Sequence, residues 1–159
     1  MNQVFEKLDS MQIEYEVVNH EPCITTEEAD KFIENIEGIR SKTLFLVGKK
    51  KRNYYLVILD DSKKLDIKKF NDIVNDKLSF AKEEDLEEKL ALKRGYVSLF
   101  GILNNKEKDV KIYLDNDIFK EERISFHPNM NTATLFIKNE DMLKFIKNMD
   151  FGYNIINVD

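Results

Sequence analysis

The chain has a single cysteine, only two histidines and no tryptophan among its 159 residues. Cys23 has no partner for an intramolecular disulfide, and no CxxC motif or cysteine–histidine cluster indicates a zinc site. A lone cysteine can be a nucleophile when a histidine lies nearby, or it can pack as a small apolar residue. The extended pattern of "EPCIT" favours packing. With two histidines, no Ser/His/Asp arrangement is evident either, so we expect no metal and no cofactor.

Glycines and long apolar runs are also scarce. The five glycines all fall near the ends of expected elements, and neither a GxGxxG nor a Walker pattern is present to hold nucleotide phosphates. No apolar stretch approaches the roughly 20 residues that span a bilayer. The N-terminus lacks a basic segment followed by an apolar run, which would be typical of a signal peptide. We therefore expect a cytoplasmic protein with no membrane contact.

The balance of charge restricts the possible partners. The net charge is −5 at pH 7, which argues against binding of DNA or other long nucleic acids, because that requires a basic surface. A small basic patch that reads one end of an RNA remains compatible with this charge. The one dense basic run, "GKKKRN" at 48–53, lies between two apolar runs, which favours a solvated hairpin turn over a phosphate contact.

The hydrophobic pattern mixes helices and strands. Helical spacing occurs in residues 1–11, 25–38, 66–75, 83–92 and 139–149, and strand patterns occur at 15–18, 42–48, 53–59, 110–115, 132–138 and 153–158. The continuous apolar runs 42–48 and 53–59 predict central strands covered on both faces. The chain is thus expected to be an α+β (mixed α/β) protein, with residues 1–159 forming a single domain whose mixed, largely buried sheet is flanked by helices.

One helix has clear predicted ends. Thr25 followed by Glu28 is typical of a capping box, and apolar residues recur at helical spacing as far as Ile36. Gly38 is a plausible stop. These signals predict a helix over about residues 25–38.

Two basic residues stand at the ends of apolar strands. Lys42 begins the run 42–48, where an unpaired ammonium is costly to bury. It either points to solvent or lies at the mouth of a pocket, where it would meet an anion. His127 lies between Phe126 and Pro128, just before the strand at 132–138, and either hydrogen-bonds structurally or serves a site. Asn131 and Thr132 add neutral polar groups beside it.

Four stretches carry a family resemblance. They are "NHEPCITTEEA" (19–29), "SKTLFLVGKKKRNYYLVIL" (41–59), "LSFAKEEDLEEKLALKRGYVSLFGILNN" (78–105) and "ISFHPNMNTATLFI" (124–137). In this order they resemble the YbaK/aminoacyl-tRNA synthetase-associated domain family. The resemblance is closest to the PrdX-like, freestanding Ala-tRNA(Pro) deacylases related to the editing domain of prolyl-tRNA synthetases.

The resemblance implies an aminoacyl-tRNA hydrolase that edits mischarged tRNA(Pro), most of all Ala-tRNA(Pro), without a covalent intermediate. It implies that Lys42 holds the phosphate or aminoacyl-adenosine end of the tRNA and that His127 orients the substrate or the attacking water. The amides of the loop from Gly95 to Gly101 are expected to approach the substrate closely. Prolyl-tRNA synthetase is a second expected partner. The expected substrate-binding residues are Ile24, Thr43, Gly95, Ser98, Leu99, Phe100, Gly101, Asn131 and Thr132, of which Ile24, Thr43, Leu99 and Phe100 are expected to wall the pocket.

Two positions depart from the family pattern, and other functions stay open. Leu99 stands where the family loop usually has proline, and Thr43 stands where asparagine often follows the lysine. Both changes bear on substrate preference more than on fold. The alternatives are deacylation of another mischarged tRNA, such as Cys-tRNA(Pro) or Ser-tRNA, and a non-catalytic module that binds aminoacyl-tRNA or a synthetase or senses an amino acid. The negative net charge favours the module.

Overall fold

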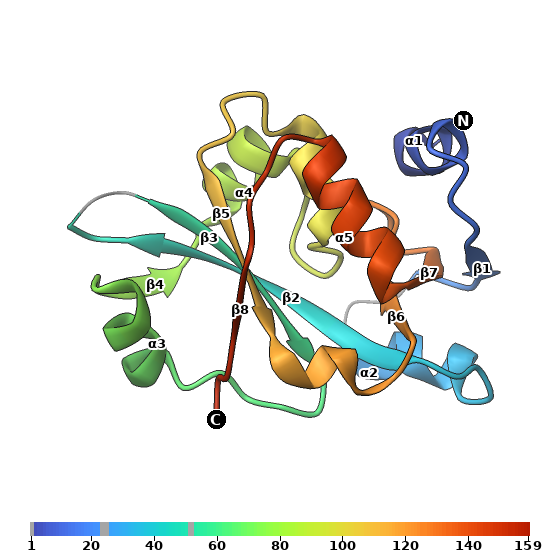
Figure 1. The fold of residues 1–159 in the computed structure, drawn as a ribbon, viewed down its shortest axis with the longest axis horizontal. Helices are drawn as coiled ribbons and strands as arrows, with labels where there is room; N and C mark the ends of the chain where they lie inside the picture. The colour runs from blue at the N-terminus through green and yellow to red at the C-terminus, as the bar shows by residue number, and fades with distance from the viewer. Residues whose placement is uncertain (1, 23–25, 51–52) are drawn as a thin grey trace.

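A computed structural model of the protein describes residues 2–22, 26–50 and 53–159 and shows a mixed sheet with helices on both faces (Figure 1). The strands are β1 (Glu16–Asn19), β2 (Ile39–Gly48), β3 (Tyr54–Asp60), β4 (Leu78–Phe80), β5 (Val110–Asp115), β6 (Arg123–Phe126), β7 (Ala133–Lys138) and β8 (Asn154–Ile156). The α-helices are α1 (Gln3–Ser10), α2 (Thr26–Asp30), α3 (Ile67–Val74), α4 (Glu83–Leu90) and α5 (Asn139–Asn148). Three 3-10 helices complete the described elements: η1 (Lys31–Ile33), η2 (Leu99–Asn104) and η3 (Asn116–Lys120).

The sheet has the strand order β1-β7-β6-β2-β3-β5-β8, and β4 pairs separately with β2. Strand β3 runs antiparallel to β2 and parallel to β5, and β2 runs parallel to β6. The prediction of a mixed, largely buried sheet flanked by helices is therefore confirmed.

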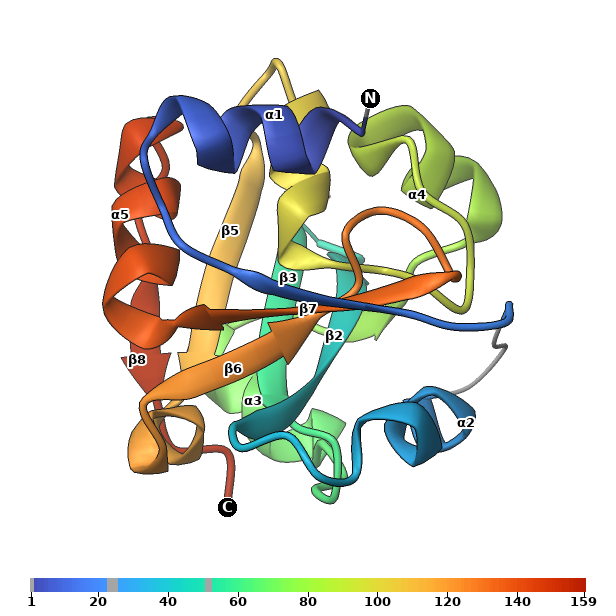
Figure 2. The ribbon, with the colours of Figure 1, turned by 90° about the vertical axis from the view of Figure 1, so that its right-hand side faces the viewer.

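Strand β3 is covered on both faces, as its continuous apolar sequence predicts. Tyr54, Leu56 and Ile58 join the larger core cluster, to which α1, α4, α5 and η2 contribute. The intervening side chains belong to a second cluster with Phe70 of α3, on the opposite face of the sheet. Figure 1 shows α4 and α5 on one side of the sheet and α3 on the other, with α1 on the far side of α5 from α4. Figure 2 shows α1 at the top of the turned view.

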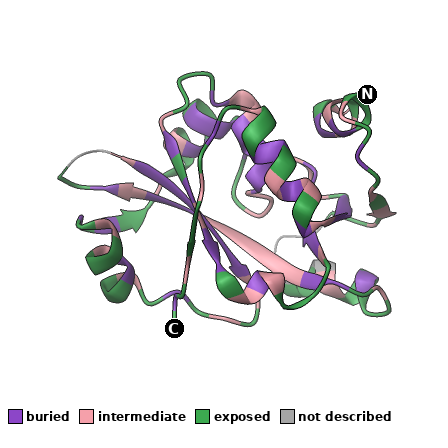
Figure 3. Cartoon of the chain, viewed as in Figure 1, coloured by how far each residue is buried: buried purple, intermediate pink, exposed green. Residues whose placement is uncertain are grey.

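Strand β2 differs from the expectation of full burial. Its first residue is buried, but the five residues 40–44 are only partly buried (Figure 3). One edge of β2 pairs with β3 along residues 41–47. The other edge is shared, because β6 pairs with residues 39–40 at one end and β4 pairs with residues 46–48 at the other. Between these two partners, the edge of β2 pairs with no described strand. This gap splits the sheet.

Most of the predicted elements are confirmed. The helices predicted within 1–11, 66–75, 83–92 and 139–149 are present, as are the strands predicted at 15–18, 53–59, 110–115, 132–138 and 153–158, with ends shifted by a few residues. Strands β2 and β3 pair antiparallel, and the backbone N–H of Gly48 donates to the carbonyl of Asn53 at 2.9 Å, as expected of a hairpin. Residues 51 and 52 of the basic run at 48–53 lie outside the described residues. Within the described ranges, no helix is both long and apolar enough to cross a bilayer.

The helix predicted over 25–38 is wrong in its second half. The α-helix ends at Asp30, and only the 3-10 turn η1 follows. Ile33 is buried, but Phe32 is 47% exposed and stacks on the His20 ring at a centroid distance of 5.1 Å. Contacts with the segment before the helix therefore override the local periodicity. Thr25, the predicted capping residue, lies outside the described residues.

Candidate active site

The split in the sheet opens into a cavity of about 470 Å³. Residues 41–45 of β2 form one side, and the other sides come from β4, the end of β6 and the loop before η2. The cavity is lined by Asp30, Ser41, Lys42, Thr43, Leu44, Phe45, Phe80, Ala81, Leu86, Arg94, Gly95, Val97, Ser125, Phe126, His127 and Thr134. Lys42, Thr43, Gly95 and His127, four of the residues expected from the sequence, thus line one cavity although they come from distant parts of the chain.

Lys42 is a partly buried cation on the cavity wall. Within the described part of the chain, no ion pair of its ammonium is found. The charge of Lys42 acts on Asp61, where it partly offsets the stronger effects that raise the pKa of that carboxyl. An ammonium that lines a cavity without a bound counter-ion can attract an anionic ligand.

His127 follows directly after β6 and is also partly buried. Burial lowers the pKa of His127 below its ordinary value of 6.5, a hydrogen bond with the Ala133 backbone acts in the opposite direction, and the nearby His20 adds to the lowering. The ring is therefore neutral at pH 7. Its Nδ1 is buried and has no hydrogen-bond partner among the described residues.

The second histidine connects to the same wall through Thr134. His20 Nε2 lies 3.0 Å from Thr134 Oγ1, and its Nδ1 lies 2.8 Å from the Glu21 carbonyl oxygen. Because a carbonyl can only accept, Nδ1 donates, and in the neutral ring Nε2 accepts from the Thr134 hydroxyl. His20 therefore orients a cavity residue.

Two carboxylates meet beside the cavity. Asp61 Oδ2 is buried and faces no donor among the residues that the structure describes, and its neighbour is the carboxylate of Asp30. Two carboxylates hydrogen-bond only when one of them holds a proton. Burial, together with the hydrogen bond and charge of Asp30, raises the pKa of Asp61 to about 8. Asp61 is therefore mostly protonated at pH 7.

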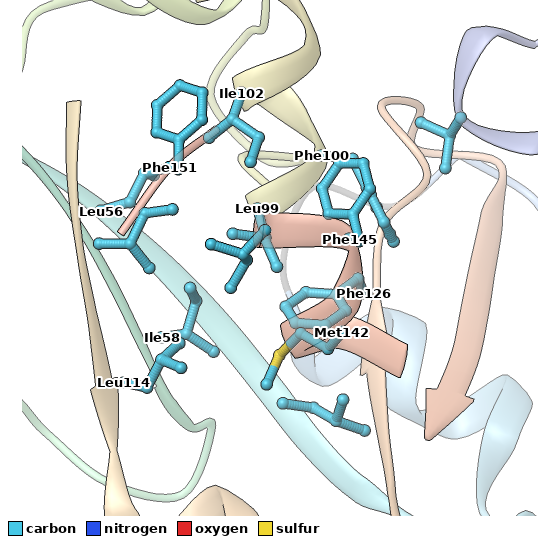
Figure 4. Close-up of a cluster of buried hydrophobic side chains, with 14 of the residues drawn as sticks. Leu56, Ile58, Leu99, Phe100, Ile102, Leu114, Phe126, Met142, Phe145 and Phe151 are labelled. Carbon is cyan, nitrogen blue, oxygen red and sulfur yellow. The ribbon is translucent and has the colours of Figure 1, made fainter. Parts of the chain in front are cut away.

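The expected glycine loop contributes only its first half to the cavity. Gly95, with φ of +99°, and Val97 line it. Leu99 and Phe100, expected to wall the pocket, are 0% exposed and lie in the larger core cluster, and Figure 4 shows both beside Phe126 and Phe145. Their position differs from the expectation because η2 turns this segment into the core.

The end of the same loop is also part of the core. Ser98 is fully buried, and its hydroxyl accepts from the Phe100 N–H at 3.2 Å, which caps η2. A Cβ added at Gly101 would lie 2.9 Å from Leu92 Cδ1 and 3.0 Å from Leu90 Cβ. Gly101 is therefore required by packing against the end of α4, and neither residue lines the cavity.

Asn131 and Thr132 lie in the turn after His127 and are not among the lining residues. Thr132 is exposed, and its carbonyl accepts from the backbone N–H of His20 at 2.9 Å, which extends the pairing of β1 with β7. Thr134, two positions later, supplies the hydroxyl at the cavity. Ile24 and Cys23 lie outside the described residues.

Several lining residues were not expected from the sequence. Arg94 and Phe80 are exposed, and Asp30, Ser125 and Thr134 come from three further segments. Arg94 directly precedes Gly95 and Phe80 lies in the "LSFA" stretch, so local sequence offered a signal for both. No local sequence signal indicated Asp30, because its role depends on the contact with Asp61. In the described ranges, no group of three or more histidine, cysteine, aspartate or glutamate residues is arranged to hold a metal ion.

Comparison with known proteins identifies the family to which the sequence is similar. The profile of the aminoacyl-tRNA editing domain family matches residues 20–145. The chain is 40% identical to the prolyl-tRNA editing protein ProX of Acetoanaerobium sticklandii, over 91% of this chain and 88% of that protein. It is 33% identical to prolyl-tRNA synthetase associated domain-containing protein 1 of Bos taurus, over 97% and 92% of the two chains. A solved structure described as a candidate trans-editing enzyme for prolyl tRNA synthetase superposes with a TM-score of 0.74 at 21% identity, covering 91% of this chain and 86% of its own.

Proposed function

The chain belongs to the aminoacyl-tRNA editing domain family, and from this membership we propose that it is a trans-editing hydrolase. Its substrate is mischarged tRNA(Pro), and its main substrate is Ala-tRNA(Pro). The observation that carries the proposal is the cavity in the split sheet, which is lined by both Lys42 and His127. A relative named as a prolyl-tRNA editing protein, 40% identical over most of both chains, supports tRNA(Pro) as the RNA.

The reaction requires correct positioning of the ester and the attacking water more than it requires a strong nucleophile. An aminoacyl ester is already activated, and the ribose hydroxyl beside the ester bond can help to deliver water. Water attacks the carbonyl carbon, the bond from that carbon to the ribose oxygen breaks, and the ribose oxygen takes a proton. Free amino acid and uncharged tRNA leave, and no covalent bond to the protein forms.

The cavity residues have separate roles in this reaction. Lys42 holds the phosphate or the ester end of the RNA by its charge. His127, neutral at pH 7 because burial lowers its pKa, hydrogen-bonds the attacking water or the ribose hydroxyl. The N–H of Gly95, at the cavity wall, is the backbone donor for the developing oxyanion.

Selectivity for alanine over proline is proposed to come from size. A close wall rejects a larger side chain strongly, whereas a pocket discriminates only weakly against smaller ones. Thr43, Phe45 and Phe126 line the cavity and supply such a wall. Of the predicted wall residues, Thr43 is the one found among the described residues that line the cavity.

The test is to incubate the protein with Ala-tRNA(Pro), Pro-tRNA(Pro), Cys-tRNA(Pro) and a Ser-tRNA, and to follow release of each amino acid. Rapid loss of alanine with proline retained is the expected result. Equal loss of proline would overturn the size selection. Binding of the tRNAs without turnover would instead support the hypothesis of a non-catalytic binding module.

The variant Lys42→Ala keeps the apolar strand and removes the charge. We expect kcat/KM for Ala-tRNA(Pro) to fall by about 100-fold, because a charge-assisted contact to the substrate is lost. Lys42→Arg, which retains the charge, should keep a larger share of the activity. Full activity of Lys42→Ala would remove this lysine from the site.

Contact with prolyl-tRNA synthetase is a separate proposal, to be tested by co-purification of the two proteins.

A further inference from the structure

Phe80 is a large aromatic side chain in an unusual position. It is 56% exposed, more than Phe32, Ile73 or Ile155, the other exposed large hydrophobic residues of the described chain. Single exposed apolar residues are common and need no explanation by themselves. Phe80, however, is the one of these four that lines the cavity.

The backbone holds Phe80 in place. Strand β4 pairs with β2, with Phe80 opposite Leu46, and the N–H of Ala81 donates to the Phe45 carbonyl at 2.9 Å. Two residues earlier, Leu78 is 7% exposed and belongs to the second core cluster. The ring is therefore presented from a strand whose position does not depend on any ligand, which is the arrangement expected of a preorganised contact.

The charges beside Phe80 indicate the kind of ligand. Lys42 and Arg94 line the same cavity, and no ion pair of either is found in the described part of the chain. A flat apolar ring and two cations that line one cavity complement a ligand that joins an aromatic base to a phosphate, because the one lining carboxylate among the described residues, Asp30, is engaged with Asp61. Aromatic side chains that stack on bases beside a positively charged groove are a recurrent means of binding single-stranded RNA.

We propose that Phe80 is the stacking platform for the nucleobase of the terminal nucleotide, the one that carries the amino acid. This inference rests on the proposed function, in which that nucleotide enters the cavity. Stacking on the base places the ribose and its ester between Phe80 and the pair of Lys42 and His127. Phe80 is then a positioning residue, because it contacts the base and not the reacting ester.

The kinetic test compares Phe80→Ala, Phe80→Tyr and Phe80→Trp with Ile155→Ala, a matched change at an exposed apolar residue away from the cavity. For Phe80→Ala we expect KM for Ala-tRNA(Pro) to rise about 10-fold with little change in kcat, the scale of one lost base–aromatic stack. Phe80→Tyr and Phe80→Trp should restore KM, and Ile155→Ala should match the wild type. An unchanged KM for Phe80→Ala would overturn the inference.

A binding test separates this inference from the proposed function. The chain has no tryptophan, so Phe80→Trp introduces a single fluorophore at the cavity. Adenosine 5′-monophosphate should quench its fluorescence, and ribose 5-phosphate, which lacks the base, should not. Quenching without any deacylation would retain the stacking platform and reject the hydrolase. Deacylation by the wild type, with no quenching and an unchanged KM for Phe80→Ala, would reject the platform alone.

Discussion

Lys42 and His127 are the residues whose electrostatics define the cavity. The ammonium of Lys42 has no ion-pair partner within the described residues, and the buried Nδ1 of His127 has no hydrogen-bond partner there. The His127 nitrogen is a buried polar group without a described partner, which costs stability and calls for an explanation, whereas Lys42 is only partly buried. Both residues line the same cavity, which neither position in the sequence reveals alone.

The rate of deacylation should depend on pH through His127. Burial lowers the pKa of its ring below 6.5, so the ring stays neutral near pH 7 and becomes charged only on the acid side of its ordinary pKa. We expect kcat/KM to be level around neutrality and to fall only at a pH below the ordinary histidine pKa of 6.5, where the ring becomes charged. His127→Ala should lower kcat by about 100-fold and remove this acid limb.

His20→Asn is the control for this profile, because the chain has two histidines. The acid limb should persist in that variant. If the limb disappeared with His20→Asn and remained with His127→Ala, the catalytic assignment of His127 would be wrong.

At the scale of elements, the short segment formed by α2 and η1 adds a wall to the cavity. Its Asp30 faces Asp61, which directly follows β3, and the two carboxyls share a proton. The α-helix ends at Asp30, so this carboxyl lies at the junction between α2 and the 3-10 turn η1. The contact of this segment with the residue after β3 is therefore sensitive to the charge of Asp61.

The free energy of unfolding should decrease as this proton is lost. In the folded protein Asp61 keeps its proton to about pH 8, whereas its ordinary pKa is 3.8. Between these values the folded state binds more protons than the unfolded chain, so the stability contribution is full below about pH 4 and falls as the pH rises through about 8. Asp61→Asn should flatten this dependence and stabilise the protein by about 1–2 kcal/mol at about pH 9, a figure reduced for solvent screening of the half-exposed carboxyl.

Denaturant unfolding of both proteins at pH values from about 5 to 9 measures this difference. Asp72→Asn, at an exposed position of α3, is the control and should leave the pH dependence unchanged. Parallel stability curves for the wild type and Asp61→Asn would contradict the shared proton.

At the scale of the whole molecule, the split sheet creates the site. Strand β2 is long enough to pair with β6 at one end and β4 at the other, and the uncovered edge between them borders the cavity. The net charge of −5 gives no general attraction for RNA. Binding must then depend on a few local cations, which include Lys42 and Arg94.

This limited set of cations predicts a weak dependence on salt. With two phosphate contacts to a single-stranded end, kcat/KM should fall by only about sevenfold between about 50 and about 200 mM salt. Arg94→Ala should reduce the slope, because one contact is lost. A much steeper slope in the wild type would show that further basic residues, such as those of the run at 48–53, also contact the RNA.

Local pattern was sufficient for most of the elements. The continuous apolar run 53–59 predicted the buried strand β3, and the pattern at 110–115 predicted β5, with Val110, Ile112 and Leu114 buried. These patterns work because burial of one or both faces repeats with the period of the backbone itself. Local pattern failed at Phe32, where stacking on His20 replaced the continuation of a helix.

The sequence by itself determined most of the strands and helices and the two polar residues at strand ends, Lys42 and His127, that merit a functional hypothesis. Only the tertiary structure decided that Leu99 and Phe100 fill the core while Phe80 and Arg94 line the cavity, and that Asp30 meets Asp61. The physical reason is that a cavity forms where strands fail to pair. That failure depends on which distant segments reach the same edge of β2, and periodicity along the chain carries no information about it.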